Sequence, residues 1–230
     1  MMDLPRHHNS SAHTRGLLDL AGRVAKLKSV PRTGWLDRGI DPQVAESVAD
    51  HSLGVALLAW ACAIQRRDEG ASLDPERVLK LALVHDLAEA EIGDLTPYDP
   101  AEIPGAHEPV ARRAFLETRH IRDTHRDDDK RAREDAAMRT LIDALPGATG
   151  AEFEEVWDEL RLGTSAEARF VKQVDRLETF LQSRHYLRAD PNLPMSSFRQ
   201  EVVESIDDPL LGAIRDTALA DEASDSDAGN

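Results

Sequence analysis

Apolar residues recur along most of this chain at intervals of three and four positions, the spacing that gathers side chains on one face of an α-helix. The first such segment covers residues 15–28, with an apolar stripe at Leu17, Leu18, Ala21, Val24 and Leu27. A second covers residues 43–66, with apolar positions at Val44, Val48, Val55, Leu58, Ala59 and Cys62. Residues 30–42 lie between them and contain two prolines and two glycines, so we predict a loop there.

A third helix is predicted in the stretch SLDPERVLKLALVHDLAEAEIG, residues 72–93, from its end signals as well as from its periodicity. Asp74 can cap it, Pro75 suits the first helical position, and Gly93 can end it. Further helices are predicted near residues 107–121, 130–144, 151–161 and 165–188, with two short ones between 196 and 218. No segment alternates apolar and polar residues in the manner of a strand. The expected fold class is therefore all-α.

A chain of 230 residues can bury one substantial core, so we expect one domain with additions at its ends. We predict a flexible N-terminus at 1–14, the domain itself at 15–190, C-terminal helices packed on it at 191–218, and a disordered acidic tail at 219–230. Residues 118–135 are dense in charges of both signs, and we interpret them as a solvated helix end or loop.

The formal net charge is −15, from 43 acidic and 28 basic residues, which argues against a nucleic-acid polymer as the main partner. The basic residues are mostly arginine, which suggests either a high-salt habitat or a genome rich in arginine codons. No uninterrupted apolar run is long enough to span a bilayer, and the N-terminus lacks the apolar segment of a secretory signal. Cys62 is the single cysteine, so we expect a reducing, cytoplasmic location.

The stretch LALVHDLAEAEIGDL, residues 81–95, joins an apolar helix to an imidazole and several carboxylates. On a continuous helix, Glu89 lies one turn beyond His85 and Asp86. Neutral imidazole and carboxylate together suit a divalent ion such as Mn, Co, Zn or Fe. A metal ion would also explain how such groups tolerate burial, because an unpaired buried carboxylate is costly.

Two ligands do not complete a metal site, and two other predicted helices each offer a further one. His51, in ESVADHSLGVALLAW, lies on the apolar stripe of its helix and should point inward. Asp175, in ARFVKQVDRLETFLQ, comes one position after Val174 and two before Leu177, which makes it a second inward candidate. Each residue also has an ordinary structural interpretation, as a core histidine and as half of a surface ion pair. Spacing alone leaves both interpretations open.

The order H…HD…D resembles the motif of the HD-domain metal-dependent phosphohydrolases, and within them most closely the 5′-deoxynucleotidase subgroup. The matching stretches follow the family's order and are LKSVPRTGW, ESVADHS, ALVHDLAEAEIGDLTP, EEVWDEL and EARFVKQVDRLETFLQ. They cover roughly residues 16–188, whereas the charged stretch at 118–135 and the region after about 190 are unmatched. The resemblance implies an HD-domain helical bundle with a buried metal site.

The resemblance also implies a role for individual residues. It implies one divalent metal ion bound by four ligands, His51, His85, Asp86 and Asp175. It makes Glu89 and Asp94 the catalytic acids, and it places Arg32 and Trp35 in the segment that contacts substrate. The structural alternatives are a turn cap for Asp94, a surface salt bridge for Arg32 and core packing for Trp35.

The implied activity is removal of phosphate from deoxyribonucleoside 5′-monophosphates by a homodimer that acts on a small-molecule nucleotide. One alternative is another HD phosphohydrolase, acting on a ribonucleotide, a cyclic dinucleotide or a guanosine alarmone. A second alternative is a non-catalytic helical binding protein. All the ligand positions and both acids are present in this chain, which speaks against the second alternative.

Overall fold

The computed structural model describes residues 7–228, and within that range the chain is helical and contains no β-strand. The all-α expectation is therefore confirmed. The elements, in chain order, are α1 (His7–Leu27), α2 (Thr33–Asp37), α3 (Val48–Asp68), α4 (Pro75–Val84), α5 (Glu89–Ile92), the 3₁₀ helix η1 (Pro100–Glu102), α6 (Pro109–Glu117), α7 (Thr124–Ala144), α8 (Gly147–Leu162), α9 (Ala166–Ala189), α10 (Ser196–Ser205) and α11 (Pro209–Ala228).

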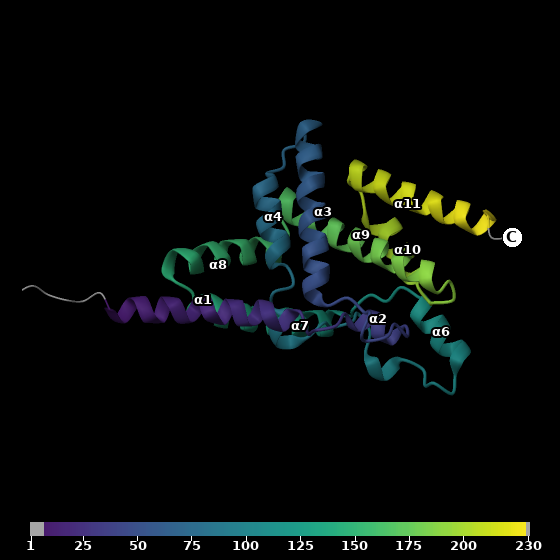
Figure 1. Cartoon of the computed structure of the whole chain (residues 1–230), viewed down its shortest axis with the longest axis horizontal. Helices are drawn as coiled ribbons and strands as arrows, with labels where there is room; N and C mark the ends of the chain where they lie inside the picture. Colours follow the sequence, from purple (N-terminus) through teal and green to yellow (C-terminus); the bar gives the residue numbers. More distant parts are fainter. Residues whose placement is uncertain (1–6, 229–230) are drawn as a thin grey trace, which may run out of the picture.

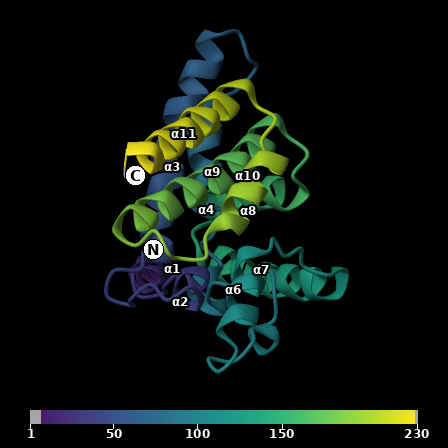
Figure 2. The same cartoon turned by 90° about the vertical axis from the view of Figure 1, so that its right-hand side faces the viewer.

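Helices α3, α4 and α9 pack against one another and form the centre of the fold (Figure 1). Figure 2 shows α10 and α11 beside α9, with α1 and α7 crossing beneath the central helices. The central helices meet through apolar side chains that are fully buried: Val55, Ala59, Val78, Leu81, Val174 and Leu177. This packing brings the first turn of α3, the end of α4 and the middle of α9 close together.

The first helix turns a different face inward from the one its apolar stripe predicts. The predicted stripe is largely exposed, at 48% for Leu17, 60% for Leu18 and 43% for Val24. Instead α1 crosses α7 at Gly16, where an added Cβ would lie 1.8 Å from the carbonyl oxygen of Ala144. Only glycine permits so close a backbone approach, and this contact sets the orientation of the helix.

Three segment boundaries differ from the sequence prediction. α1 begins at His7, so residues 7–14 are helical rather than part of a flexible terminus. The loop predicted at 30–42 contains the short helix α2. Most of the charged stretch 118–135 forms the first part of α7, which agrees with the helix end that was one of its two interpretations. α11 extends to Ala228, into the segment for which the composition predicts disorder. No proline or glycine interrupts residues 213–228, and alanine there favours the helix.

The signals at the start of the predicted third helix are confirmed. The side chain of Asp74 accepts a hydrogen bond from the backbone N–H of Glu76, and Pro75 is the first helical residue. Gly93 ends α5 with φ +76°, a backbone conformation that favours glycine.

The same helix is interrupted where the sequence predicts a continuous one. α4 ends at Val84, and α5 begins at Glu89. In the turn between them, the N–H of Leu87 donates to the carbonyl of Val84 at 3.1 Å, three positions back instead of the four of an α-helix. The turn carries His85 and Asp86. The apolar periodicity runs through this break and so could not reveal it.

By length and composition, α3 is long and apolar enough to cross a membrane, with a mean hydropathy of 1.3, and no other described helix is. Its uninterrupted apolar run covers only residues 53–64, so the sequence statement about uninterrupted runs is unchanged. In the structure α3 is the central helix of the fold and packs against α4 and α9. Its outward face keeps an apolar stripe at Leu53, Leu57 and Trp60, which are 59%, 55% and 44% exposed.

Candidate active site

Four side chains from three separate parts of the chain meet at the first turn of α3. We call His51, His85, Asp86 and Asp175 the four-ligand cluster. Nε2 of His51 lies 3.0 Å from Oδ1 of Asp175 and 3.6 Å from Oδ2 of Asp86. Nε2 of His85 lies 3.4 Å from Nε2 of His51 and 3.2 Å from Oδ2 of Asp86. The structure therefore brings together all of the predicted ligands.

These separations fit ligands of a single ion. Ligand atoms held about 2.1 Å from an ion lie about 3.0 Å apart at right angles and about 3.4 Å apart at tetrahedral angles. The four separations given above, from 3.0 to 3.6 Å, lie in or close to this range, and the ligand atoms of His51, His85 and Asp175 all lie within 4.8 Å of one another. Two imidazoles with two carboxylates form a donor set that suits a divalent transition metal. The residues present therefore fit the predicted metal ion.

Both histidines direct the same ring nitrogen toward the centre of the cluster. Nδ1 of His85 donates to the carbonyl of Ala82 at 2.7 Å, and Nδ1 of His51 donates to Oε2 of Glu178 at 2.6 Å. A proton on Nδ1 leaves the lone pair of Nε2 free, which is the tautomer that binds metal through Nε2. These partners assign the same tautomer to both rings.

The cluster has strongly perturbed protonation equilibria in the absence of a metal ion. Burial and the charge of Arg32 lower the pKa of His51, but hydrogen bonds to Asp175 and Glu178 outweigh them and raise it to about 9. Burial raises the pKa of Asp86, but the neighbouring His85 outweighs it and holds that pKa below its usual range. A proton on His51 therefore compensates the carboxylates, and a metal ion has to displace it.

Glu89 is a buried carboxyl group beside the cluster. Its residue is 4% exposed, and its Oε2 has no hydrogen-bond partner among the described residues. Burial, together with the charges of Asp86 and Asp94, raises the pKa of Glu89 well above its ordinary value. A carboxyl group in this state holds a proton under conditions in which an exposed glutamate has lost it.

Asp94 links the end of α5 to the start of α2. Its Oδ2 accepts from the backbone N–H of Thr33 at 2.5 Å, and its carbonyl accepts from the hydroxyl of Thr33 at 2.8 Å. Its Oδ1 also lies 3.9 Å from Nε of Arg32. Asp94 therefore fixes the start of α2, which differs from the sequence alternative, a cap of the turn that follows Asp94.

Arg32 brings a positive charge into the site from the segment before α2. Its Nη2 makes a long hydrogen bond of 3.5 Å to the hydroxyl of Thr179. Its Nη1 is buried and has no partner among the described residues. A buried guanidinium with an unused N–H group fits an anionic ligand better than the surface salt bridge that was the alternative.

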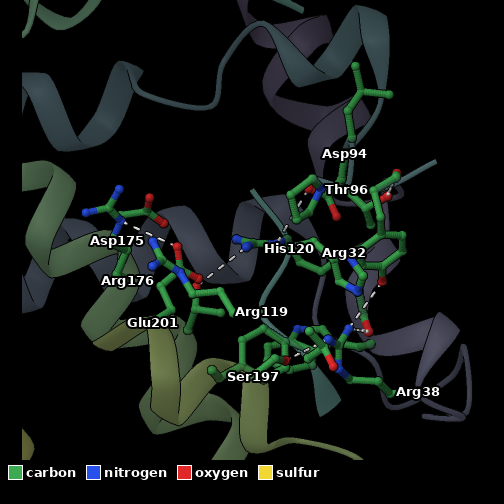
Figure 3. Close-up of a pocket in the computed structure, with 18 of the residues that line it drawn as sticks. Arg32, Arg38, Asp94, Thr96, Arg119, His120, Asp175, Arg176, Ser197 and Glu201 are labelled. Carbon is green, nitrogen blue, oxygen red and sulfur yellow. Dashed lines mark hydrogen bonds and ion pairs between the residues drawn. The ribbon is translucent and has the colours of Figure 1, made fainter. Parts of the chain in front are cut away.

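A cavity of about 300 Å³ opens beside Asp175, bounded by α2, α9, α10 and the loop at 94–98. Figure 3 shows Asp175 and Arg176 on one side of it, with Arg32 and Asp94 on the other. A second cavity of about 660 Å³ contacts His85 and also reaches Asp175. Asp175 therefore borders both cavities, whereas His85 and Asp86 border the second one.

Trp35 borders the first cavity but is almost entirely buried, at 1% exposed. Its Nε1–H donates to Oε1 of Glu46 at 2.8 Å, and its ring packs against Tyr186 and Phe198. Core packing, the alternative from the sequence, therefore describes most of this side chain. Direct contact between Trp35 and substrate stays a prediction.

Sequence reasoning missed several residues that line the site. Lys172 and Glu178 lie one helical turn before and after Asp175, and that spacing could have identified them. His120 borders both cavities but lies in the charged stretch that we interpreted as solvated. Glu201 also borders both cavities and comes from α10, beyond the stretches that carry the resemblance. Nothing local in the sequence identifies His120 or Glu201.

The family model of the HD domain matches residues 24–210. The chain is 37% identical over 177 residues to the 5′-deoxynucleotidase HDDC2 of Bos taurus, which covers 77% of this chain and 71% of the relative. It is 30% identical over 183 residues to the 5′-deoxynucleotidase hdd1 of Schizosaccharomyces pombe, covering 78% and 76%. A solved structure, a conserved hypothetical protein from Pyrococcus furiosus, is 25% identical with a TM-score of 0.63, covering 87% of this chain and 97% of its own. Together with the four-ligand cluster, these matches show that the chain belongs to the HD domain family.

Proposed function

We propose that this chain is a metal-dependent phosphohydrolase that removes phosphate from deoxyribonucleoside 5′-monophosphates. The observation that carries the proposal is the convergence of the four-ligand cluster beside a buried arginine and a buried carboxyl group, Arg32 and Glu89. Relatives with the name 5′-deoxynucleotidase, at 37% and 30% identity, support the substrate class. The cofactor in this proposal is one divalent ion, Mn, Co, Zn or Fe.

A divalent ion bound at the cluster lowers the pKa of a water molecule and polarises a phosphoryl oxygen. The residues of the chain supply the remaining functions. Arg32 donates N–H groups to phosphate oxygens and offsets the charge that develops on them. Asp94 holds the segment of Arg32 in place through Thr33, which gives it a positioning role in addition to any proton transfer.

Glu89 is the residue best suited to protonate the leaving group. Hydrolysis of a nucleotide 5′-phosphate releases the 5′-oxygen of the sugar, which must gain a proton as the P–O bond breaks. The raised pKa of Glu89 keeps a proton on a carboxyl group beside the cluster. A general acid of this kind contributes about 10²–10⁴-fold to a rate.

The first cavity suits the nucleoside. Its wall includes the aromatic residues Trp35, Tyr98 and Phe198, and it also includes Arg32 together with Asp175 of the four-ligand cluster. Aromatic walls favour bases because every base presents a flat π-face. In this arrangement the phosphate lies at the four-ligand cluster and the base lies toward α10.

A nucleotide panel tests the proposal. Deoxyribonucleoside and ribonucleoside 5′-monophosphates, a cyclic dinucleotide and a guanosine alarmone would be assayed with Mn²⁺, Co²⁺, Zn²⁺ and Fe²⁺, with released phosphate or nucleotide products as the readout. We expect the highest kcat/KM for deoxyribonucleoside 5′-monophosphates. Hydrolysis of only a diester or an alarmone would reject this substrate class. No turnover with any metal would favour the non-catalytic binding protein.

We further propose that the chain forms a homodimer through the exposed apolar stripe of α3, Leu53, Leu57 and Trp60. A second copy of the chain is the proposed occupant because the resemblance to the HD-domain family implies a homodimer, and burial of three large exposed apolar residues would stabilise one. The partner in catalysis is a small nucleotide, neither a nucleic-acid polymer nor a membrane, in line with the net charge of −15. The lone Cys62 supports a cytoplasmic location as part of the same proposal.

A further inference from the structure

Glu178 contacts a metal-ligand histidine on the side away from the cluster. Its Oε2 lies 2.6 Å from Nδ1 of His51, while Nε2 of the same ring lies 3.0 Å from Oδ1 of Asp175. The side chain of His51 is fully buried, and that of Glu178 is 14% exposed. Asp175 and Glu178 are three residues apart on α9, so one face of this helix supplies a partner to each ring nitrogen.

This contact has a direct consequence for metal binding. A carboxylate that accepts from Nδ1 fixes the proton on that atom, orients the ring and increases the basicity of Nε2. We propose that Glu178 is a positioning residue, which holds His51 in the tautomer and orientation needed to bind the metal ion. This inference rests on the proposed metal-dependent function.

The space that Glu178 occupies is created by a glycine on α3. Gly54 lies one turn after His51, and an added Cβ there would lie 2.7 Å from Oε1 of Glu178 and 3.2 Å from its Cδ. Glycine inside a helix is less favourable than alanine, and the φ angle of Gly54 is not positive. The backbone therefore does not require glycine at this position, whereas the carboxylate of Glu178 does.

A metal ion shared by Glu178 and His51 is the competing explanation for their contact. Glu46 lies near both, and the ligand atoms of the three residues are within 4.8 Å of one another. However, two ligands of one ion lie about 3 Å apart or more, and 2.6 Å is a hydrogen-bond distance. Oε1 of Glu46 is also occupied by Nε1–H of Trp35 at 2.8 Å. The geometry favours the hydrogen bond.

The test measures affinity for Co²⁺ by visible absorption in competition with a chelator, and metal content per chain by mass spectrometry. Glu178→Ala should weaken Co²⁺ binding by about 10–100-fold, as expected for a lost partner of a ligand histidine. Glu178→Gln should weaken it less, because its amide oxygen still accepts from Nδ1. His85→Ala serves as the variant in which the site itself is damaged.

Gly54→Ala tests the same contact without removing Glu178. It should also weaken Co²⁺ binding, because the new methyl group displaces the carboxylate, yet it should not lower the thermal stability of the metal-free protein. Gly22→Ala on α1 is the matched control, since nothing lies within 4 Å of a Cβ at that position, and its affinity should match the wild type. This pair separates positioning from a general effect on folding.

The ¹⁵N signals of the His51 ring give a readout that does not depend on the metal. They should indicate a single tautomer, with the proton on Nδ1, for the neutral ring of the wild type, and a mixture of tautomers in Glu178→Ala. Unchanged Co²⁺ affinity in both Glu178→Ala and Gly54→Ala would overturn the inference. So would two ions per wild-type chain with one of them lost in Glu178→Ala, because Glu178 would then be a ligand. A wild type that binds no Co²⁺ would reject the proposed function itself.

Discussion

Glu89→Gln is expected to lower catalysis and raise stability at the same time. Gln has nearly the same shape as Glu but can neither carry a charge nor donate an acidic proton. Loss of the general acid should reduce kcat by about 10²-fold or more. At about 1.36 kcal/mol for each factor of ten, this corresponds to about 3 kcal/mol or more of lost transition-state stabilisation. Metal content should remain at the wild-type level.

The stability effect follows from the pKa of Glu89 in the metal-free protein. Burial, Asp86 and Asp94 raise this pKa well above 4.5, so the folded state binds its proton more tightly than the unfolded state does. Stability therefore falls as the pH rises from about 4.5 toward the raised pKa, by about 1.4 kcal/mol for each tenfold difference in proton affinity between the two states. Glu89→Gln removes this loss. Each kcal/mol gained should raise Tm by about 2–4 °C in a chain of 230 residues.

The assay combines steady-state phosphate release, metal content and thermal unfolding of the metal-free protein at pH 5 and pH 8. The gain in Tm for Glu89→Gln over the wild type should be larger at pH 8 than at pH 5. A variant that loses stability at both pH values would show that the charged form of Glu89 is favourable in the fold. A variant that loses its metal would make Glu89 a ligand, and full activity would exclude it as the general acid.

Three further results are expected. Arg32→Ala should lower kcat/KM by about 10–100-fold, since a hydrogen bond to a charged group contributes about 1.5–3 kcal/mol; an unchanged value would place the phosphate elsewhere. The pKa of His51 is about 9 without metal, so the affinity for Co²⁺ should increase with pH up to about 9. Calorimetry in buffers of different ionisation enthalpy should detect at least one proton released on Co²⁺ binding at pH 7.5. An affinity that does not change with pH would contradict this. Leu57→Glu should convert the dimer to a monomer in size-exclusion chromatography with light scattering, whereas Leu83→Glu, at a position 55% exposed on α4, should not; a wild-type monomer would reject the homodimer.

The sequence predicted the helical architecture well because helix periodicity and end signals are local. Asp74 and Pro75 show this at the start of α4. The choice between two possible inward faces is not local, and α1 shows the consequence. Its orientation depends on the contact of Gly16 with the backbone of α7, which is far away in the sequence. The apolar stripe at Leu17 and Leu18 gave no sign of this contact.

The members of the four-ligand cluster could be predicted because each lies within a recognisable stretch of the motif. The interruption of the helix at His85 and Asp86 could not be predicted, since the apolar pattern continues across it. Glu178 has the i+3 spacing from Asp175, but its contact with His51 depends on the missing side chain at Gly54 of another helix. Such a space exists only in the packed structure, so sequence reasoning overlooked this residue.

The metal content of Asp175→Ala tests the four-ligand cluster most directly. Asp175 is 90 positions beyond His85 in the sequence, yet its carboxylate lies 3.0 Å from Nε2 of His51 in the fold. Wild-type protein and the variant would be loaded with Co²⁺, dialysed together and analysed for metal per chain, with circular dichroism to verify the helices. We expect close to one ion in the wild type and a small fraction of that in a folded Asp175→Ala. Equal metal content in the two proteins would contradict a shared metal site formed by α3, α9 and the turn after α4.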